Sequence, residues 1–319
     1  MKRVWVLGAG GMLGAALVRA LPTPGAALYR FPQPLAWSDR TQLSLQLGQG
    51  LKAFLSGLTT DDDWEIYWAA GVGAMGSSAD ELDAETQALA VLLDQLQASL
   101  PSCPAPGVIA FASSAGALYA GSPQFEITEQ TPITLLNPYA QAKRRQEQLL
   151  EAALPALAQV RVLIARFSTL YGPGQAQGKR QGLLTHIARC ALRHQPVEIF
   201  VPLDTARDYL FVDDAAGALV ASARALARWP ERLHTRIIAA ERSATISEIV
   251  STFNRLIKRR LRVVCNRNSL SALYAPRVAY RSLSPLANEG DLPQHTLLEG
   301  AAALLRAERL AYVARLNKV

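Results

Sequence analysis

The stretch VWVLGAGGMLGAAL, residues Val4–Leu17, decides the fold, because a short apolar run meets a glycine cluster and then a helical pattern. Gly8, Gly11 and Gly14 recur at three-residue spacing. Only glycine tolerates such a tight turn and lets backbone amides approach a pyrophosphate at a helix N-terminus. We therefore interpret these glycines, with Met12, as a dinucleotide-binding turn. The spacing departs from G-x-G-x-x-G, so a purely structural glycine turn remains the alternative.

Strand-like apolar runs alternate with helical patterns along the first half of the chain. The runs are RVWVLG, AALYRF, PLAWS, WEIYWAAG and GVIAFASS, and the helical patterns cover residues 12–21, 43–55 and 84–100. VRVLIARF and HTRIIAA predict two further strands, with the helical segment LLTHIARCALRHQ between them. This alternation predicts an α/β fold, a Rossmann-like doubly wound parallel sheet with helices on both faces.

The pattern changes beyond residue 240, where a helix, a short strand LRVVCN, a loop and a final helix follow. These pieces do not extend a doubly wound sheet, so they predict a smaller C-terminal α+β substrate lobe. The predicted dinucleotide-binding domain covers residues 1–170 and returns at 205–240, and the substrate lobe covers 171–204 and 241–319. We expect ligands to bind between the two.

Composition is that of a folded globular chain, with 50% hydrophobic and 18% charged residues. No apolar stretch reaches the about 18 residues of a membrane span, so we expect a cytoplasmic protein with no membrane partner. Cys103, Cys190 and Cys265 lack metal-ligand spacing, and no metal is predicted. The net charge of +7 fits a nucleic acid, an anionic small substrate or a basic surface. We interpret the densest basic run, 258–262, as a solvated helix end, and expect no nucleic-acid partner.

Two residues bear on which dinucleotide binds. Arg30 lies 22 residues after Gly8, where an NAD-selective site usually carries Asp or Glu. An arginine there pairs with a 2′-phosphate, which favours NADP over NAD, and a solvent-facing arginine is the alternative. Asp39, expected to close a third strand in WSDR, either accepts a hydrogen bond from adenine or caps a helix.

Several segments together resemble the extended short-chain dehydrogenase/reductase family, the group of NAD-dependent nucleotide-sugar epimerases and dehydratases. They are GAGGMLG, WAAG, FASSAGALY, PYAQAK, ARFSTLYGPGQ and ARDYLFVDDAAGAL, and they occur in the family's order over most of the chain. The resemblance implies that Ala70 in WAAG and Phe167 in ARFSTLYGPGQ line the cofactor site.

The segment NPYAQAK places Tyr139 and Lys143 four positions apart, on one face of an expected helix. The resemblance implies that Tyr139 is the general acid/base and that Lys143 binds the nicotinamide ribose and lowers the tyrosine pKa. A nearby ammonium does favour a phenolate. Without the upstream glycine turn, two residues on a solvated helix face would be the better interpretation.

The resemblance also implies a catalytic serine in FASSAGALY. We favour Ser114, with Ser113 as the second choice and a structural hydroxyl as the alternative to both. Dehydratases of the family usually carry an Asp-Glu pair directly after this position. The chain has no acid there, so dehydration is disfavoured. Glu85 stands where the family often has an asparagine that supports the sheet, and this departure puts local packing in doubt rather than chemistry.

Arg207 matches a family arginine that contacts the diphosphate of a nucleotide sugar, and Arg281 is a candidate for a second such arginine. The resemblance thus implies an NAD(P)-dependent epimerase or ketoreductase of a nucleotide-activated sugar that forms homodimers through a helix bundle. The alternatives are a reductase of a non-nucleotide ketone or aldehyde and a catalytically silent dinucleotide-sensing protein.

Overall fold

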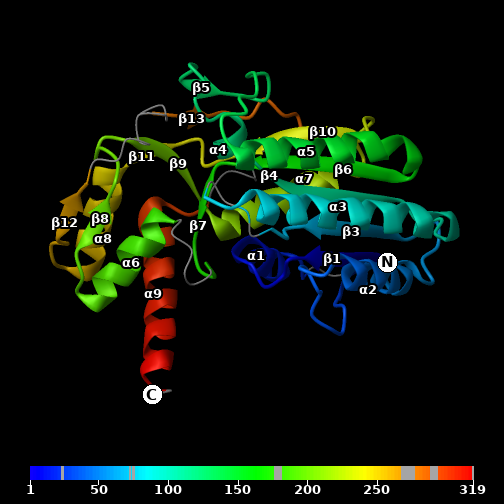
Figure 1. Cartoon of the computed structure of the whole chain (residues 1–319), viewed down its shortest axis with the longest axis horizontal. Coiled ribbons are helices and arrows are strands. Elements are labelled where there is room, and N and C mark those ends of the chain that lie inside the picture. Colours follow the sequence, from blue (N-terminus) through cyan, green and yellow to red (C-terminus); the bar gives the residue numbers. More distant parts are fainter. Residues whose placement is uncertain are drawn as a thin grey trace.

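The computed structural model describes residues 1–22, 25–71, 73, 76–175, 182–266, 277–287 and 294–317. At its centre is a six-stranded sheet in the order β10-β6-β4-β3-β1-β2, in which every neighbouring pair is parallel (Figure 1). The strands are β1 (Lys2–Leu7), β2 (Ala26–Tyr29), β3 (Asp63–Trp68), β4 (Gly107–Ser114), β6 (Val160–Phe167) and β10 (Leu233–Ile238). The α/β class with a Rossmann-like parallel sheet is confirmed.

Helices cover both faces of this sheet. One face packs against α2 (Arg40–Leu55), α3 (Ala79–Ser99) and α5 (Pro138–Ala153), and the other against α1 (Met12–Ala20) and α7 (Val212–Leu226). Successive strand residues point to opposite faces, so Trp5 joins the first hydrophobic cluster and Val6 the second. Burial on both sides explains why the central strands are almost continuously apolar.

A third hydrophobic cluster lies among α6 (Leu183–Arg193), α8 (Ile246–Ile257), α9 (Leu297–Leu316) and short strands. A three-stranded sheet has the order β11-β9-β7, and β12-β8 and β13-β5 form pairs. These strands are β5 (Glu126–Ile127), β7 (Thr169–Tyr171), β8 (Val197–Ile199), β9 (Ala206–Phe211), β11 (Ser243–Thr245), β12 (Val263–Cys265) and β13 (Ala279–Tyr280). Figure 1 shows this group to the left of the central sheet. The domain boundaries stay a prediction.

The expected third strand, PLAWS, is wrong, because residues 34–38 form no strand and β2 is the edge of the central sheet. Pro34 has no N–H to donate to a sheet. The side chain of Gln46 instead bonds the backbone on either side of Leu35, accepting from Ala36 N at 2.8 Å and donating to Pro34 O at 3.2 Å. Asp39 therefore closes no strand and is the N-cap of α2.

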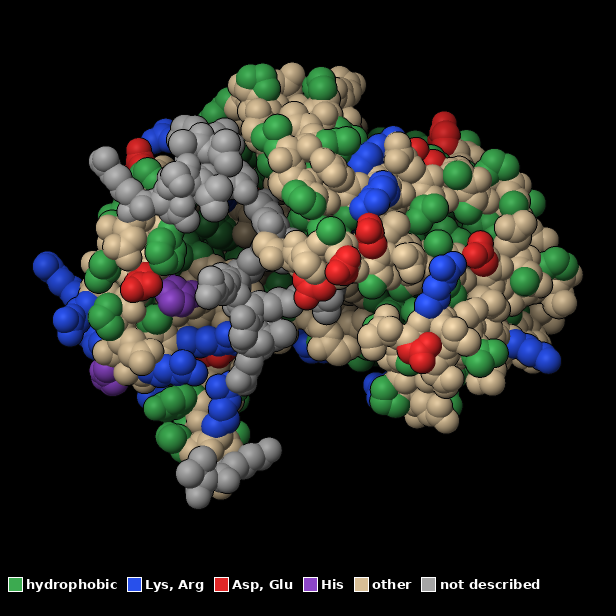
Figure 2. Space-filling view, in the orientation of Figure 1, with side chains coloured by type: hydrophobic (Ala, Val, Ile, Leu, Met, Phe, Trp, Pro, Cys, Tyr) green, Lys and Arg blue, Asp and Glu red, His purple; other side chains and the backbone are tan. Residues whose placement is uncertain are grey.

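Positive side chains gather near α6 and α9, at the lower left of Figure 2. Arg189, Arg193 and Arg315 line one small hollow there, together with Glu308. The basic run that begins at Lys258 follows the last residue of α8, and Lys258 itself is the exposed C-cap of that helix. Within the described residues, no helix combines the length and the apolar character needed to cross a bilayer.

Candidate functional site

The glycine turn lies where β1 ends and α1 begins, and it is tightly packed against the end of β3. Gly8 has a φ of +89°, and a Cβ on it would lie 2.5 Å from the Ala70 nitrogen. A Cβ on Gly14 would lie 2.0 Å from the Gly8 carbonyl oxygen. Both positions therefore require glycine, one for its backbone conformation and one for space.

The N-terminus of α1 fits the pyrophosphate of a dinucleotide. Its N-cap, Gly11, makes no side-chain hydrogen bond, and the first turn holds no acidic residue. The first amides of α1 thus remain available to an anion at the positive end of the helix. A Cβ on Gly174 would lie 3.4 Å from Met12 Cα, so the loop that follows β7 reaches this turn. Phe167, at the end of β6, is buried.

The two residues predicted to select the dinucleotide lie near the edge strand β2. Arg30 directly follows β2 and is exposed. Asp39 caps α2 by accepting a hydrogen bond from Gln42 N at 3.0 Å. The helix-cap alternative thus describes Asp39 in this structure, and an adenine contact stays a prediction.

Ser114 and Tyr139 meet at the ends of β4 and α5. Their side chains lie close enough for the Ser114 hydroxyl to lower the pKa of Tyr139. Asn137 sets the start of α5 by accepting a bond from Ala140 N at 2.8 Å, which places Tyr139 in the first turn. Ser113 points the other way and donates to Glu147 at 2.7 Å. The structure therefore brings Ser114, and not Ser113, to the tyrosine.

Lys143 lies one helical turn beyond Tyr139 and is buried. Its Nζ donates to Glu85 Oε1 at 2.8 Å and to Gln146 Oε1 at 3.1 Å. The same nitrogen lies 5.8 Å from the centre of the Tyr139 ring. The ammonium thus faces the tyrosine as predicted, but an ion pair with Glu85 of α3 holds it.

Several neighbours act on the pKa of Tyr139, in opposite directions. Burial raises this pKa above the ordinary value, Lys143 lowers it, and Glu85 raises it again. The Ser114 hydroxyl lowers it further, but the net direction is upward. Lys143 therefore lowers the tyrosine pKa as expected, but in the free protein desolvation of the phenolate outweighs the lysine.

Sequence reasoning missed the contact that Glu85 makes. We expected this residue to bear on local packing rather than chemistry, and its carboxylate contacts the predicted catalytic lysine. The signal lay in its position, since Glu85 falls between Leu82 and Leu89 on the buried stripe of α3. A charge on such a stripe needs a partner.

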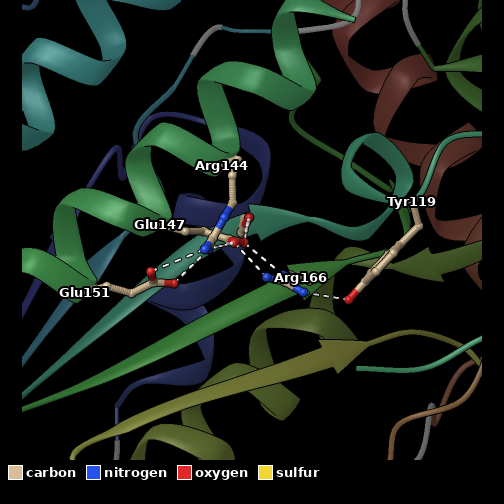
Figure 3. Close-up of polar contacts among 6 residues, drawn as sticks. Tyr119, Arg144, Glu147, Glu151 and Arg166 are labelled. Carbon is tan, nitrogen blue, oxygen red and sulfur yellow. Dashed lines mark hydrogen bonds and ion pairs between the residues drawn. The ribbon is translucent and has the colours of Figure 1, made fainter. Parts of the chain in front are cut away.

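A second buried network lies beneath the site (Figure 3). Glu147 of α5 binds Arg166 of β6, and Arg166 Nη1 donates to the Tyr119 hydroxyl at 2.6 Å. Arg144 binds Glu147 at 3.2 Å and Glu151 at 2.7 Å, toward the surface. The network joins α5 to β6, so it fixes the helix that carries Tyr139 against the sheet.

The two predicted substrate arginines lie on neighbouring elements, because β13 packs against β9. Arg207 is partly buried on β9 and donates to Ala206 O at 2.8 Å, whereas Arg281 is exposed just beyond β13. Burial raises the pKa of Tyr209 to about 12, although Arg207 opposes the shift. Tyr280 also lies close to Arg207, and burial raises its pKa too. Neither tyrosine was predicted at the site.

No cluster of three or more His, Cys, Asp or Glu side chains suited to a metal ion occurs among residues that the structure describes. Cys103 and Cys190 are buried free thiols, and Cys265 is exposed.

Comparison with known proteins gives the family. The model of the NAD dependent epimerase/dehydratase family matches residues 4–234. A UDP-glucuronate 4-epimerase of Thermodesulfobacterium geofontis is 31% identical over 117 residues, which are 36% of this chain and 34% of the relative. The chain thus spans about a third of the length of the curated relatives that it matches.

Solved structures share the fold over nearly the whole chain. MoeE5 in complex with UDP-glucose and NAD has a TM-score of 0.76 and 22% identity, covering 97% of this chain and 99% of its own. RMD from Pseudomonas aeruginosa complexed with NADPH has a TM-score of 0.74 and 20% identity, covering 96% and 99%. With its glycine turn, parallel sheet and matching family model, the chain belongs to the NAD dependent epimerase/dehydratase family.

Proposed function

We propose that the protein is an NAD(P)-dependent epimerase of a nucleotide-activated sugar. The observation that carries the proposal is the meeting of Ser114, Tyr139 and Lys143: the Ser114 hydroxyl lowers the pKa of Tyr139, and the Lys143 Nζ lies 5.8 Å from the centre of the Tyr139 ring. The family match and the 4-epimerase relatives support the reaction class. The structural likeness to MoeE5 with UDP-glucose supports a nucleotide-sugar substrate.

Each residue of the site has a role in the proposed reaction. When bound, the nicotinamide takes a hydride from a sugar carbon and returns it. Tyr139, in its phenolate form, takes the hydroxyl proton as that carbon is oxidised to a ketone and gives the proton back as the ketone is reduced. Ser114 donates a hydrogen bond to the same oxygen when negative charge develops there. Lys143 holds positive charge that stabilises the phenolate form of Tyr139.

The residues on β9 and β13 are proposed to hold the substrate. The guanidinium of Arg207 provides paired donors for a diphosphate, and Tyr209 and Tyr280 lie beside it. Arg281 is a second candidate, since it lies at the end of β13. A neutral ketone or aldehyde would make no use of these cations.

The experiment supplies UDP-glucose and UDP-glucuronate, in turn, with NAD or NADP, and separates the C4 epimers by chromatography. We expect conversion of at least one by the wild-type protein and none by Tyr139→Phe, which should still bind the dinucleotide. Calorimetry with uridine, thymidine and guanosine diphosphates tests the substrate class independently. Binding of none of the three would overturn the nucleotide-sugar proposal in favour of a simple ketone reductase.

We further propose NADP as the preferred dinucleotide, because the residue directly after β2 is Arg30 and not an Asp or Glu. The likeness to RMD complexed with NADPH is compatible with this choice, and the likeness to MoeE5 is compatible with NAD. An enzyme that exchanges its dinucleotide freely would carry out a net ketone reduction. Identification of the dinucleotide that co-purifies with the protein decides between NADP and NAD.

We also propose that two copies of the chain associate through α3 and α5. These helices pack side by side on one face of the sheet. Their outer faces are joined by an exposed ion pair, Arg145 Nη2 to Asp83 Oδ1 at 2.8 Å. Light scattering of the purified protein gives the mass that decides between a monomer and a dimer.

A further inference from the structure

The carboxylate of Glu85 contacts residues of the proposed active site through both of its oxygens. Oε1 accepts from Lys143 Nζ at 2.8 Å and from Gln146 Nε2 at 3.3 Å, and Oε2 accepts from Gly73 N at 3.0 Å. The side chains of Glu85 and Lys143 are only 5% and 7% exposed. Water therefore screens this pair little, and its charges act strongly on their neighbours.

The backbone that follows β3 is shaped around this carboxylate. A Cβ on Gly71 would lie 2.6 Å from Glu85 Oε1. A Cβ on Gly73 would lie 2.8 Å from Glu85 Oε2 and 3.3 Å from Tyr139 Cε2. One segment of backbone thus touches the carboxylate and the tyrosine ring together, which places Glu85 within the site rather than beside it.

The ammonium of Lys143 has few donors left for any other ligand. It can donate three hydrogen bonds, and its contacts are Glu85, Gln146 and, at 3.5 Å, the carbonyl oxygen of Ala112. A ribose that binds Lys143 must therefore share the ammonium with Glu85 or displace the weakest of these contacts.

We propose that Glu85 is a positioning residue, which holds the Lys143 ammonium in a buried ion pair. Its carboxylate partly offsets the lysine charge, so Lys143 stabilises the phenolate of Tyr139 less than an unpaired ammonium would. The inference rests on the proposed role of Tyr139 in proton transfer. Glu85 contacts no reacting atom and acts only through the lysine and the electric field at the phenol.

Few charged groups face this pair among the described residues. From α5 they are the titratable Tyr139 and the carboxylate of Glu147, which raises the pKa of Lys143 but is itself bound to Arg166 and Arg144. From β4 the contacts are the uncharged Phe111 ring and the Ala112 carbonyl. Glu85 is therefore the negative charge that most directly offsets the lysine.

The pKa directions agree with this arrangement. Burial opposes the charged form of Glu85, yet Lys143 and the bonds from Gly73 and Gln146 hold its pKa below the ordinary value. Burial likewise opposes the charged form of Lys143, yet Glu85 raises its pKa. The pair stays ionised at neutral pH, and Glu85 contributes to the raised pKa of Tyr139.

The test replaces Glu85 with its neutral isostere, Glu85→Gln, and titrates Tyr139 by NMR of protein labelled at the tyrosine ζ carbon, with no ligand present. Tyr139→Phe identifies the signal. We expect the Tyr139 pKa to fall by about one unit, because an unpaired ammonium nearby favours the phenolate. The matched control is Asp83→Asn, which removes one negative charge from the exposed α3–α5 ion pair and should leave Tyr139 unchanged.

An unchanged Tyr139 pKa in folded Glu85→Gln would overturn the proposal. If that variant fails to fold, titration of the Glu85 carboxyl carbon in the wild-type protein decides, because a Glu85 protonated at neutral pH excludes the ion pair. Both readouts use the free protein, so they hold even if no sugar nucleotide is converted. Where conversion is seen, the ascending limb of kcat against pH should move toward acid by the same amount.

Discussion

Arg166 of β6 binds Glu147 of α5 through two hydrogen bonds, from Nε to Oε1 at 2.9 Å and from Nη2 to Oε2 at 2.7 Å. Both side chains are buried. This bidentate pair joins a central strand to the helix that carries Tyr139 and Lys143 (Figure 3). The position of that helix over the sheet therefore depends on a buried charge pair as well as on apolar packing.

Loss of the Glu147 carboxylate should destabilise the fold. Glu147→Ala leaves Arg166 buried without its acid, and removing one partner of a buried pair costs about 3–5 kcal/mol. The free energy of unfolding in urea measures the effect. Glu151→Ala is the matched control, since Glu151 also binds Arg144 but its side chain is 36% exposed. We expect the control to lose less than about 1 kcal/mol, and equal losses in both variants would contradict the buried role of Glu147.

Substitutions of the two adjacent serines should have different effects, one mainly on turnover and the other mainly on stability. Ser114→Ala removes the hydroxyl that lies beside Tyr139, so kcat should fall on the order of a hundredfold, as for loss of one donor to a developing oxyanion. Ser113→Ala removes a bond to Glu147 that lies away from Tyr139, so it should lower stability and leave kcat nearly unchanged. Turnover and thermal unfolding of both variants test this. A large kcat loss in Ser113→Ala alone would reverse the assignment.

Elements buried on both faces were predictable because their sequence signal is continuous. The bounds expected for GVIAFASS and VRVLIARF are those of β4 and β6. PLAWS carried a similar apolar signal, but its proline and the Gln46 side chain give these residues other hydrogen bonds. The pairing of β13 with β5 could not be predicted from the sequence. A two-residue strand is too short to show an alternation of apolar and polar residues, and the two strands lie far apart in the chain.

In the proposed site, too, the sequence predicts contacts within one element but not contacts between elements. Tyr139 and Lys143 share a helix, so their spacing in the sequence fixes their common face. Glu85 reaches Lys143 from another helix, 58 residues away in the chain, and only the packing of α3 against α5 brings them together. The lowering of the Tyr139 pKa by Lys143 was predictable, but the opposing effects of burial and Glu85 were not, because both are products of tertiary packing.

The glycine turn should tolerate an added methyl group at one position and not at another. Gly14→Ala places a Cβ 2.0 Å from the Gly8 carbonyl oxygen, so the turn must shift. We expect a loss of about 1–3 kcal/mol in the free energy of unfolding, typical of overpacking, and weaker dinucleotide binding. Gly10→Ala is the control, because its Cβ would meet no atom within 4 Å. Equal stability of the two variants would show that the turn adapts.

The choice of dinucleotide should depend on Arg30, which stands exposed directly after the edge strand β2. Arg30→Gln removes a guanidinium placed to bind a 2′-phosphate and leaves the turn that would hold the pyrophosphate untouched. A hydrogen bond to a charged group contributes about 1.5–3 kcal/mol, so NADP affinity should fall roughly tenfold to a hundredfold while NAD affinity stays nearly constant. Arg40→Gln, an exposed arginine in the first turn of α2, controls for the loss of one positive charge nearby. Fluorescence titration with both dinucleotides gives the ratio of affinities. If Arg30→Gln and Arg40→Gln lower NADP affinity by the same small factor, Arg30 acts only as a surface charge, and the preference for NADP loses its structural basis.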